Sequence, residues 1–340
     1  FTSEVSENHP ILSVRNLSVY FPIKRGFIVQ REVARVRAVD GISFDIYPGE
    51  TLGLVGESGS GKTTVAKSVI QLTKADVGSV KFEGQELVGL STPAMRPIRR
   101  KIGMVFQDPY GSLNPKMRAG DIIGEPLKVH HLVESRENYR SQIASLLSTV
   151  GLSSAMAERY PNEFSGGQRQ RLGIARAIAA GPSMLILDEA VSALDVSIQA
   201  QVLNLLQDLQ EQYNLAYLFI AHDLSVVRHI SHRVAVMYLG RIVETATSSD
   251  MYENPLHPYT QALLSAIPTP NPVHERSRER IILRDDLPSP IDPPSGCRFH
   301  TRCPVATDLC SQTDPDLRVL APNQQAACLL VPGYSGAKGV

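Results

Sequence analysis

The feature that most constrains this chain is a glycine-rich loop between an apolar run and a helical segment. Residues Gly56–Thr63 read Gly-Glu-Ser-Gly-Ser-Gly-Lys-Thr and match the pattern G-x-x-x-x-G-K-[ST] in full. The loop follows the expected strand Thr51–Val55 and opens the expected helix Lys62–Leu72, which is the context that this P-loop motif needs. Its glycines let backbone N–H groups face phosphate oxygens, and the helix N-terminus adds partial positive charge. The motif predicts a nucleotide site, with Lys62 between the β- and γ-phosphates and the Thr63 hydroxyl on Mg²⁺.

Charge and hydropathy exclude some classes of protein. Lys and Arg together number 34, and so do Asp and Glu, which makes the net charge zero. The basic excess typical of a nucleic-acid binder is missing, so we expect no nucleic-acid partner. No apolar run reaches the roughly 18–20 residues that cross a bilayer, so we expect no membrane span. The chain begins at Phe1, which indicates either processing or one stretch of a longer polypeptide.

Two acids follow an apolar run later in the chain. Met184–Leu187 predicts a buried strand, and Asp188 and Glu189 come directly after it. Carboxylates at the exit of a buried strand are costly without a role, although solvated acids at a strand edge are the alternative. Together with the P-loop they favour a hydrolytic site. Asp188 would hold Mg²⁺ through water, and Glu189 would polarise the attacking water as general base.

Strand and helix patterns alternate along the chain, which indicates a parallel sheet covered by helices. Ser165 is a candidate N-cap for one helix, and Gly181-Pro182 is its stop signal. The basic segment 22–37 is expected to be a loop or a hairpin extension. The remaining expected strands are 12–21, 38–46 and 217–220, and the remaining expected helices are 127–150, 165–180 and 197–213.

A second glycine motif carries a family resemblance. Phe164-Ser165-Gly166-Gly167-Gln168 resembles the signature motif of ABC ATPases, which usually begins with Leu. The P-loop, this signature and the carboxylate pair follow in that family's order. Three further motifs match the family as well, namely a Q-loop glutamine at Gln107, a D-loop at Ser192–Asp195 and a switch histidine in Ala221-His222-Asp223.

The resemblance covers about residues 11–250 and implies an α/β fold. It implies a P-loop NTPase of the ABC ATPase type at 1–252, with a mixed sheet core and a helical subdomain at about 108–180. Residues 253–340 would form an irregular C-terminal extension that contains the cysteines.

The resemblance also implies a role for each motif. Ser165 and the glycine amides of the signature would contact the γ-phosphate of ATP held by a second domain, so each domain supplies half of two sites. Asp195 would lie at the seam between the two domains. Gln107 would sense Mg²⁺ and water, His222 would contact the γ-phosphate, and Phe21 would stack on adenine, with Tyr20 as the competitor. The implied catalytic residues are Glu189, His222 and Gln107, the implied Mg²⁺ ligands are Thr63, Gln107 and Asp188, and the implied ATP-binding residues are Phe21, Gly56, Ser58, Gly59, Ser60, Gly61, Lys62, Thr63, Thr64, Ser165, Gly166, Gly167, Gln168 and Asp195.

Two segments indicate a branch of this family. Residues 107–115 read Gln-Asp-Pro-Tyr-Gly-Ser-Leu-Asn-Pro and resemble the Q-loop stretch of oligopeptide and dipeptide importer ATPases. Residues 254–263 read Asn-Pro-Leu-His-Pro-Tyr-Thr-Gln-Ala-Leu and resemble the segment that follows their core. A generic loop is the alternative for each. Importers of nickel or glutathione have similar ATPases, so the cargo stays open between these solutes and peptides.

All four cysteines lie in the extension, which holds 13 of the 23 prolines. A proline-rich segment has little core and gains from a metal site, and a cytoplasmic ATPase is not expected to carry structural disulfides. Four thiolates suit zinc or an iron–sulfur cluster, and the lack of short C-x2–4-C pairs favours the cluster. Resemblance to importer ATPases with such a tail implies a [4Fe-4S] cluster, with zinc or free thiols as the alternatives. The implied ligands are Cys297, Cys303, Cys310 and Cys328.

The resemblance implies a peripheral subunit on the cytoplasmic face of the plasma membrane, with ATP and Mg²⁺ as its cofactors. Its partners would be a second ABC ATPase domain, separate or fused, two membrane-spanning permease subunits and an extracytoplasmic solute-binding protein. A soluble ABC ATPase acting on DNA or ribosomes is the alternative. DNA-repair types insert a long coiled coil between P-loop and signature, and the 103 residues from Lys62 to Ser165 are too few for it. Glu189 and His222 argue against a regulatory module without turnover.

Overall fold

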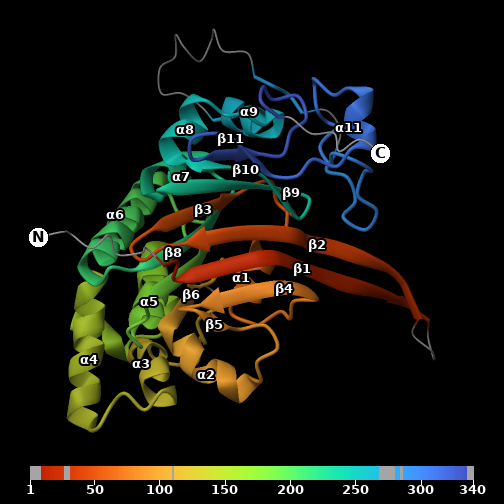
Figure 1. The fold of residues 1–340 in the computed structure, drawn as a ribbon. Helices are drawn as coiled ribbons and strands as arrows, with labels where there is room; N and C mark the ends of the chain where they lie inside the picture. The colour runs from red at the N-terminus through yellow and green to blue at the C-terminus, as the bar shows by residue number, and fades with distance from the viewer. Residues whose placement is uncertain (1–8, 27–30, 109–110, 268–279, 284–285, 335–340) are drawn as a thin grey trace, which may run out of the picture. The chain divides into compact units, whose positions relative to one another are not determined.

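The computed structural model describes residues 9–26, 31–108, 111–267, 280–283 and 286–334 (Figure 1). The chain forms two compact units. Unit 1 comprises Phe1–Ser13, Asp45–Thr51 and Lys81–Ala221. Unit 2 comprises Val14–Phe44, Leu52–Val80 and His222–Val340, so it contains both the P-loop and the C-terminal extension.

Unit 2 contains a mixed sheet in the order β11-β12-β10-β9-β3. The strand β3 (Thr51–Val55), as predicted, pairs in parallel with β9 (Arg233–Tyr238). The next strands, β10 (Arg241–Thr247), β12 (Gln324–Ala326) and β11 (Arg318–Ala321), are added antiparallel. All of β3 is buried, as is β9 after its first residue. Strands buried on both faces need such continuous apolar runs.

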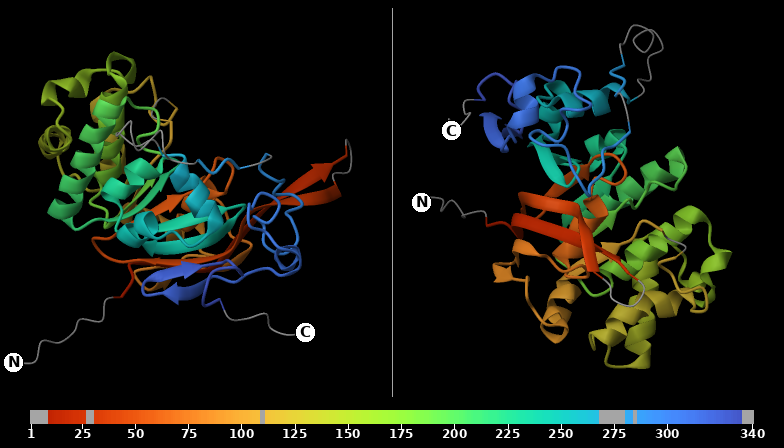
Figure 2. Two further views of the ribbon diagram at one scale, coloured as in Figure 1. Left: turned by 90° about the horizontal axis from the view of Figure 1, so that it is seen from above. Right: turned by 90° about the vertical axis from the view of Figure 1, so that its right-hand side faces the viewer.

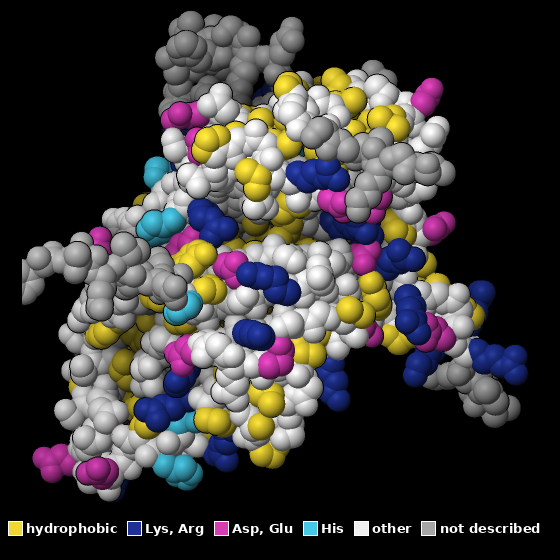
Figure 3. All heavy atoms as spheres, in the orientation of Figure 1, with side chains coloured by type: hydrophobic (Ala, Val, Ile, Leu, Met, Phe, Trp, Pro, Cys, Tyr) yellow, Lys and Arg dark blue, Asp and Glu magenta, His cyan; other side chains and the backbone are white. Residues whose placement is uncertain are grey.

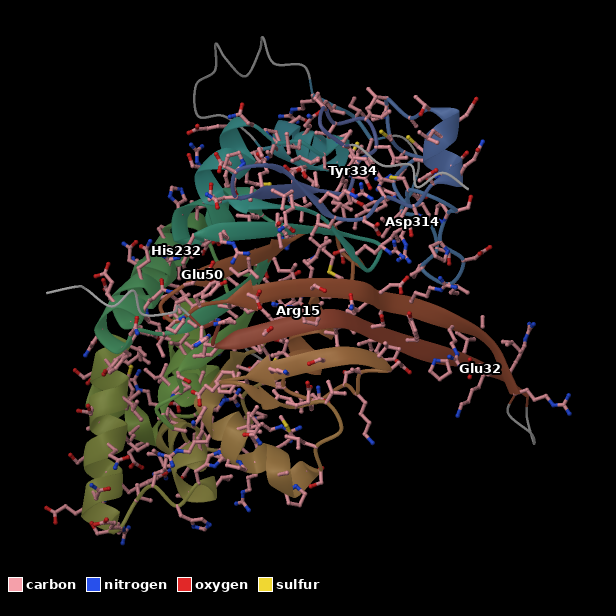
Figure 4. The ribbon with its side chains drawn as sticks, viewed as in Figure 1. Arg15, Glu32, Glu50, His232, Asp314 and Tyr334 are labelled. Carbon is pink, nitrogen blue, oxygen red and sulfur yellow. The ribbon has the colours of Figure 1, made fainter. Side chains whose placement is uncertain are left out.

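A long hairpin forms a second layer of unit 2. It consists of β1 (Leu12–Arg25) and β2 (Arg31–Ile46), and β4 (Val77–Phe82) pairs with β1 in the order β2-β1-β4. Residues 22–25 and 31–37, expected as a loop or hairpin extension, therefore continue the two strands (Figure 2). Exposed basic side chains gather at the distal end (Figure 3), where Glu32, labelled in Figure 4, pairs with Arg35.

Short helices complete unit 2. They are α1 (Lys62–Val69), α7 (Leu224–Ile230), α8 (Ser248–Glu253), α9 (Pro258–Ser265) and α11 (Asp308–Gln312). Helix α1 ends three residues before the predicted Leu72. The Ser68 hydroxyl donates back to the Thr64 carbonyl at 2.7 Å, and Gln71 adopts a left-handed φ of +53° that no longer continues a helix.

The extension is fastened to this sheet by one buried carboxylate. Glu244 of β10 is fully buried. Its carboxylate accepts hydrogen bonds from the backbone N–H groups of Leu256 and His257, both at 2.8 Å, and from Nε2 of Gln324 at 3.0 Å. The extension, expected to be irregular, thus contributes strands and helices, and none of those described exceeds eight residues. Its proline content explains why they stay short.

Unit 1 contains three parallel strands in the order β8-β7-β6, with the short β5 (Gln85–Glu86) outside them. They are β6 (Ile102–Val105), β7 (Met184–Asp188) and β8 (Ala216–Ala221). The helices of unit 1 are α2 (Thr92–Lys101), α3 (Ala119–Val129), α4 (Arg136–Thr149), α5 (Gly166–Ile178) and α6 (Val196–Tyr213), with the 3₁₀ turns η1 (Ser154–Glu158) and η2 (Pro161–Glu163).

Two helix predictions in unit 1 have different outcomes. The helical structure expected at 127–150 is confirmed only in part, because α3 ends at Val129 and His131 takes a φ of +55° before α4 begins. Ser135 then caps α4 by accepting a hydrogen bond from the N–H of Asn138 at 3.1 Å. The helix expected at 165–180 is confirmed as α5, with Ser165 as its N-cap. Gly181, with a φ of +66°, follows its end as the stop signal predicted.

Candidate functional site

The P-loop joins β3 to α1 in unit 2, in the predicted strand–loop–helix arrangement. Gly56 and Gly61 both have positive φ, +151° and +108°. A Cβ on Gly56 would lie 2.1 Å from the Met237 carbonyl oxygen, and one on Gly61 would lie 2.1 Å from that of Ala38. Only glycine can occupy these positions, because the loop packs directly against backbone. Ser58 and Gly59 are exposed at its crest, and Thr63 and Thr64 are half-buried in the first turn of α1.

Lys62 lies inside the curl of the loop. Its side chain is buried, and Nζ donates hydrogen bonds to the carbonyl oxygens of Gly56 at 2.8 Å and Glu57 at 2.9 Å. The Oγ of Ser60, which is also buried, lies 3.4 Å away. The loop therefore holds one ammonium group at its centre, with the N-terminal end of α1 beside it. Both features favour an anion.

The two candidates for adenine stacking are neighbours on β1 but have different surroundings. The hydroxyl of Tyr20 donates to Oδ1 of Asp40 at 2.8 Å, and its backbone N–H donates to Oδ2 of Asp76 at 2.7 Å. Phe21 points to the opposite side of the strand and is 42% exposed. An exposed aromatic ring is the one able to stack on a base.

The carboxylate pair and the Q-loop glutamine meet in unit 1. Asp188 ends β7 and is 2% exposed, whereas Glu189 is half-buried. Glu189 has a left-handed φ of +48°, and its N–H donates to the carbonyl of Ile220 at 2.9 Å. Nε2 of Gln107, which follows β6, donates to Oε2 of Glu189 at 2.8 Å. The ends of adjacent parallel strands bring these residues together at one edge of the sheet.

The signature residues form the N-terminus of α5. Ser165 Oγ accepts from the N–H of Gln168 at 3.3 Å, and Gln168 Oε1 accepts from the N–H of Ser165 at 3.0 Å, which is a capping box. Ser165 is exposed and Phe164 is buried beneath it. A Cβ on Gly167 would lie 2.4 Å from Cγ2 of Ile198, so a side chain there would displace α6. Asp195 is exposed at the N-cap of α6.

Some predicted site residues are brought together within a unit and others are not. Unit 2 holds the P-loop, Phe21 and His222, which is exposed directly after β8. Unit 1 holds Gln107, Asp188, Glu189, the signature residues and Asp195. Within the importer-type Q-loop stretch, Pro109 and Tyr110 lie outside the described residues. The other importer-type segment forms the entry to α9, where His257 accepts the N–H of Tyr259 at 3.0 Å as N-cap.

The four cysteines line one small cavity of about 10 Å³, together with His257 and Phe299. Burial, helped by the neighbouring thiols, raises the pKa of Cys297 to about 12. Backbone bonds fix the segment, since the Cys297 N–H donates to the Cys310 carbonyl at 2.8 Å. The donor set suits a thiolate-bound metal. Nevertheless, within the described residues no group of three or more His, Cys, Asp or Glu side chains is positioned to hold a metal ion.

Sequence reasoning missed contacts between the P-loop and the extension. Glu57, the second residue of the P-loop, pairs through its carboxylate with Arg302 and through its backbone N–H with the Tyr259 hydroxyl. Tyr259 lies in the importer-type segment 254–263, but no pattern in the sequence links it to Glu57, 202 positions earlier, or links Arg302 to Glu57, 245 positions earlier. A hollow of about 810 Å³ among α3, α4 and η1 was not expected either; Arg118, Lys128 and Tyr139 are part of its lining.

Two family models match the chain. The ABC transporter model matches residues 39–192, which include the P-loop, the signature and the carboxylate pair. The model for the oligopeptide/dipeptide transporter C-terminal region matches residues 243–310, which include Tyr259 and three of the cysteines.

Relatives of known name match along nearly the whole chain. The oligopeptide transport ATP-binding protein AppF of Bacillus subtilis is 53% identical over 94% of this chain and 97% of its own length. The oligopeptide transport ATP-binding protein OppF of Salmonella typhimurium is 51% identical over 92% of this chain and 94% of its own. Among solved structures, the dimeric ATP-binding cassette MJ0796 bound to ADP and Pi has a TM-score of 0.63 at 27% identity, covering 70% of this chain and 98% of that one. This chain therefore belongs to the ABC transporter ATP-binding proteins, in the oligopeptide/dipeptide transporter family.

Proposed function

We propose that this chain is the ATP-hydrolysing subunit of an ABC importer that powers uptake of di- and oligopeptides. The observation that carries the activity is the Gln107–Glu189 hydrogen bond beside buried Asp188 at the end of β7. It supplies a positioned carboxylate base next to a second carboxylate suited to Mg²⁺. The names of the relatives support peptides as the cargo. The second candidate function is the uptake of nickel or glutathione.

Each motif has a part in this proposal. Lys62 and the P-loop amides bind the β- and γ-phosphates, and Thr63, Asp188 and Gln107 hold Mg²⁺ directly or through water. Glu189 takes the proton of the attacking water, and His222 contacts the γ-phosphate. Phe21 stacks on adenine; its exposure and the engagement of Tyr20 with Asp40 support this choice. The capping box leaves the end of α5 at the surface, where Ser165 can meet ATP bound by a second domain.

We propose the following partners. A second ABC ATPase domain completes the two sites, and two permease subunits carry the peptide path through the membrane. A solute-binding protein delivers peptide from outside, and this chain acts on the cytoplasmic face. Among the described helices, none is long and apolar enough to cross a bilayer.

We propose that the four cysteines hold a [4Fe-4S] cluster, with zinc as the alternative. The convergence of four thiols on one cavity supports a metal site, and their spacing supports the cluster. The cavity between the thiols has a volume of about 10 Å³. Iron, acid-labile sulfide and zinc are to be measured on anaerobically purified protein. About four irons and four sulfides per chain support the cluster; stoichiometric zinc without sulfide replaces it with a zinc site.

The function is tested with the complete transporter in proteoliposomes. We expect ATP-dependent accumulation of a labelled tripeptide that is lost in the Glu189→Gln variant. Competition by excess peptide, glutathione or Ni²⁺ identifies the cargo class. Accumulation of Ni²⁺ or glutathione without peptide would replace the proposed cargo, and uptake that continues in the variant would refute Glu189 as the base.

A further inference from the structure

The second residue of the P-loop is tied to the C-terminal extension by an ion pair. The Arg302 guanidinium contacts both carboxylate oxygens of Glu57, at 2.8 Å to Oε2 and 3.3 Å to Oε1. The Arg302 side chain is 7% exposed and that of Glu57 is 28% exposed. A two-point contact fixes the orientation of a carboxylate as well as its position. The pair therefore sets the direction in which the Glu57 side chain leaves the loop.

The backbone of Glu57 is held on both sides as well. Its N–H donates to the Tyr259 hydroxyl at 3.0 Å, and its carbonyl accepts from Nζ of Lys62 at 2.9 Å. Every polar group of Glu57 thus has a partner in unit 2, and one of these partners is the lysine expected to reach the phosphates. Leu287 of the extension also lies near the crest of the loop, because a Cβ added to Gly59 would be 3.7 Å from its Cδ2.

The extension can serve as a support because its contact residues are themselves fixed. Tyr238, Tyr259 and Phe299 are buried and pack in pairs with ring centroids 4.7–5.3 Å apart. The Arg302 guanidinium lies over the Tyr238 ring, 6.0 Å from its centroid. Arg298, four residues earlier, is buried and anchored to the Leu239 carbonyl and to Asp40. Tight aromatic packing leaves Arg302 little freedom to follow a moving loop.

We propose that Arg302 is a positioning residue for ATP binding, acting through Glu57 on the backbone that surrounds Lys62. This inference rests on the proposed function, since it assumes that the P-loop binds ATP. Without the pair, the loop between Gly56 and Ser60 samples further conformations, and the apparent affinity for ATP falls in proportion to the competent fraction. Once ATP is bound the loop is ordered, so turnover at saturation is preserved. The C-terminal extension is accordingly part of the nucleotide site's support.

The test uses the complete transporter carrying Arg302→Gln. We expect the KM for ATP to rise about tenfold while kcat stays within about twofold of wild type. Arg302→Lys keeps the charge but loses the two-point contact. Its KM for ATP should therefore lie between that of wild type and that of Arg302→Gln. The matched control is Arg318→Gln, which removes another extension arginine with an aromatic partner, Tyr334 at 4.9 Å (labelled in Figure 4), away from the P-loop. Its KM should equal that of wild type.

A double-mutant cycle separates positioning from general damage. Glu57→Gln alone should raise KM as Arg302→Gln does, and the two together should raise it no further, because both remove the same contact. If Arg302→Gln does not fold, Glu57→Gln and Tyr259→Phe replace it in the test. Each should raise the KM for ATP by the same factor. Additive effects, a loss of kcat at unchanged KM, or an equal rise in Arg318→Gln would overturn the inference. Wild type that lacks ATPase activity refutes the proposed function instead, so the two failures are distinguishable.

Discussion

Nε2 of Gln107 lies 2.8 Å from Oε2 of Glu189, so the Q-loop amide holds the carboxylate at the end of β7. The backbone of Glu189 is fixed independently, by its own N–H on Ile220 and by the Ser192 hydroxyl on its carbonyl at 3.0 Å. A hydrogen bond from an amide N–H to a charged carboxylate is about twice as strong as one between neutral groups, so it favours one position of the carboxylate. The carboxylate is therefore directed before any water or nucleotide arrives, and two separate changes test it.

Glu189→Gln should lower kcat by about 10²–10⁴-fold, the usual contribution of a general base. The amide keeps the shape of the side chain but does not accept a proton from water. ATP affinity should stay within about twofold, because Glu189 lies outside the phosphate-binding loop. Single-turnover release of phosphate and equilibrium binding of labelled ATP measure the two quantities. Glu211→Gln, at an exposed residue of α6, is the matched control. Its kcat and its affinity for ATP should equal those of wild type.

Gln107→Ala should lower kcat by about tenfold, the effect of losing one hydrogen bond to a charged group. The carboxylate of Glu189 stays present but is no longer held. In the Glu189→Gln background the same change should have a smaller effect, since the base it orients is gone and only its proposed part at Mg²⁺ remains. Steady-state ATPase measurements on the four proteins give the coupling. Independent, multiplicative losses would contradict the positioning role. Gln142→Ala is the control, since this half-buried glutamine of α4 donates its hydrogen bond to Asn138 and not to Glu189.

Local chemistry explains which parts of the molecule the sequence predicted well. The strand β3, the N-cap Ser165 and the P-loop glycines follow from patterns within about ten residues, so each could be read directly. The break between α3 and α4 depends on one positive φ at His131, and a single histidine is too weak a signal to locate such a break. Contacts such as Glu57–Arg302 join positions 245 residues apart, and only packing decides them. The four cysteines of the extension can be read from the sequence as a group, whereas the size of the cavity that they line is decided by packing.

Glu244→Gln should destabilise the protein by about 3 kcal/mol. The buried carboxylate accepts from Leu256, His257 and Gln324, and an amide turns one of its two acceptors into a donor that faces N–H groups. Because these bonds fasten the extension to β10, limited proteolysis should also cut the extension faster. Urea denaturation measures the loss of free energy of unfolding. Glu253→Gln, on the exposed face of α8, is the control. A change below about 0.5 kcal/mol in Glu244→Gln would contradict the anchoring role.

Asp40→Asn should destabilise the protein by about 3 kcal/mol at pH 7, because it leaves buried Arg298 without its ion pair. Burial alone would raise the pKa of Asp40, but the hydrogen bond from Tyr20 and the charges of Arg298 and Arg241 outweigh it and lower that pKa below the ordinary 3.8. A lowered pKa means that the unfolded chain binds the proton more readily, so the stabilisation is complete well above pH 3.8. It is lost as the pH falls through the lower pKa of the folded state.

The difference in free energy of unfolding between wild type and Asp40→Asn should therefore be constant from pH 7 to 5. It should shrink as the pH falls below about 4, where the wild-type carboxyl becomes neutral like the amide. Urea denaturation at several pH values measures it. Asp314→Asn is the matched control, since Asp314 also pairs with an arginine, Arg241, but is 46% exposed. Its effect should stay within about 1 kcal/mol. A difference that grows as the pH is lowered would show that the charge on Asp40 opposes folding and would refute this assignment.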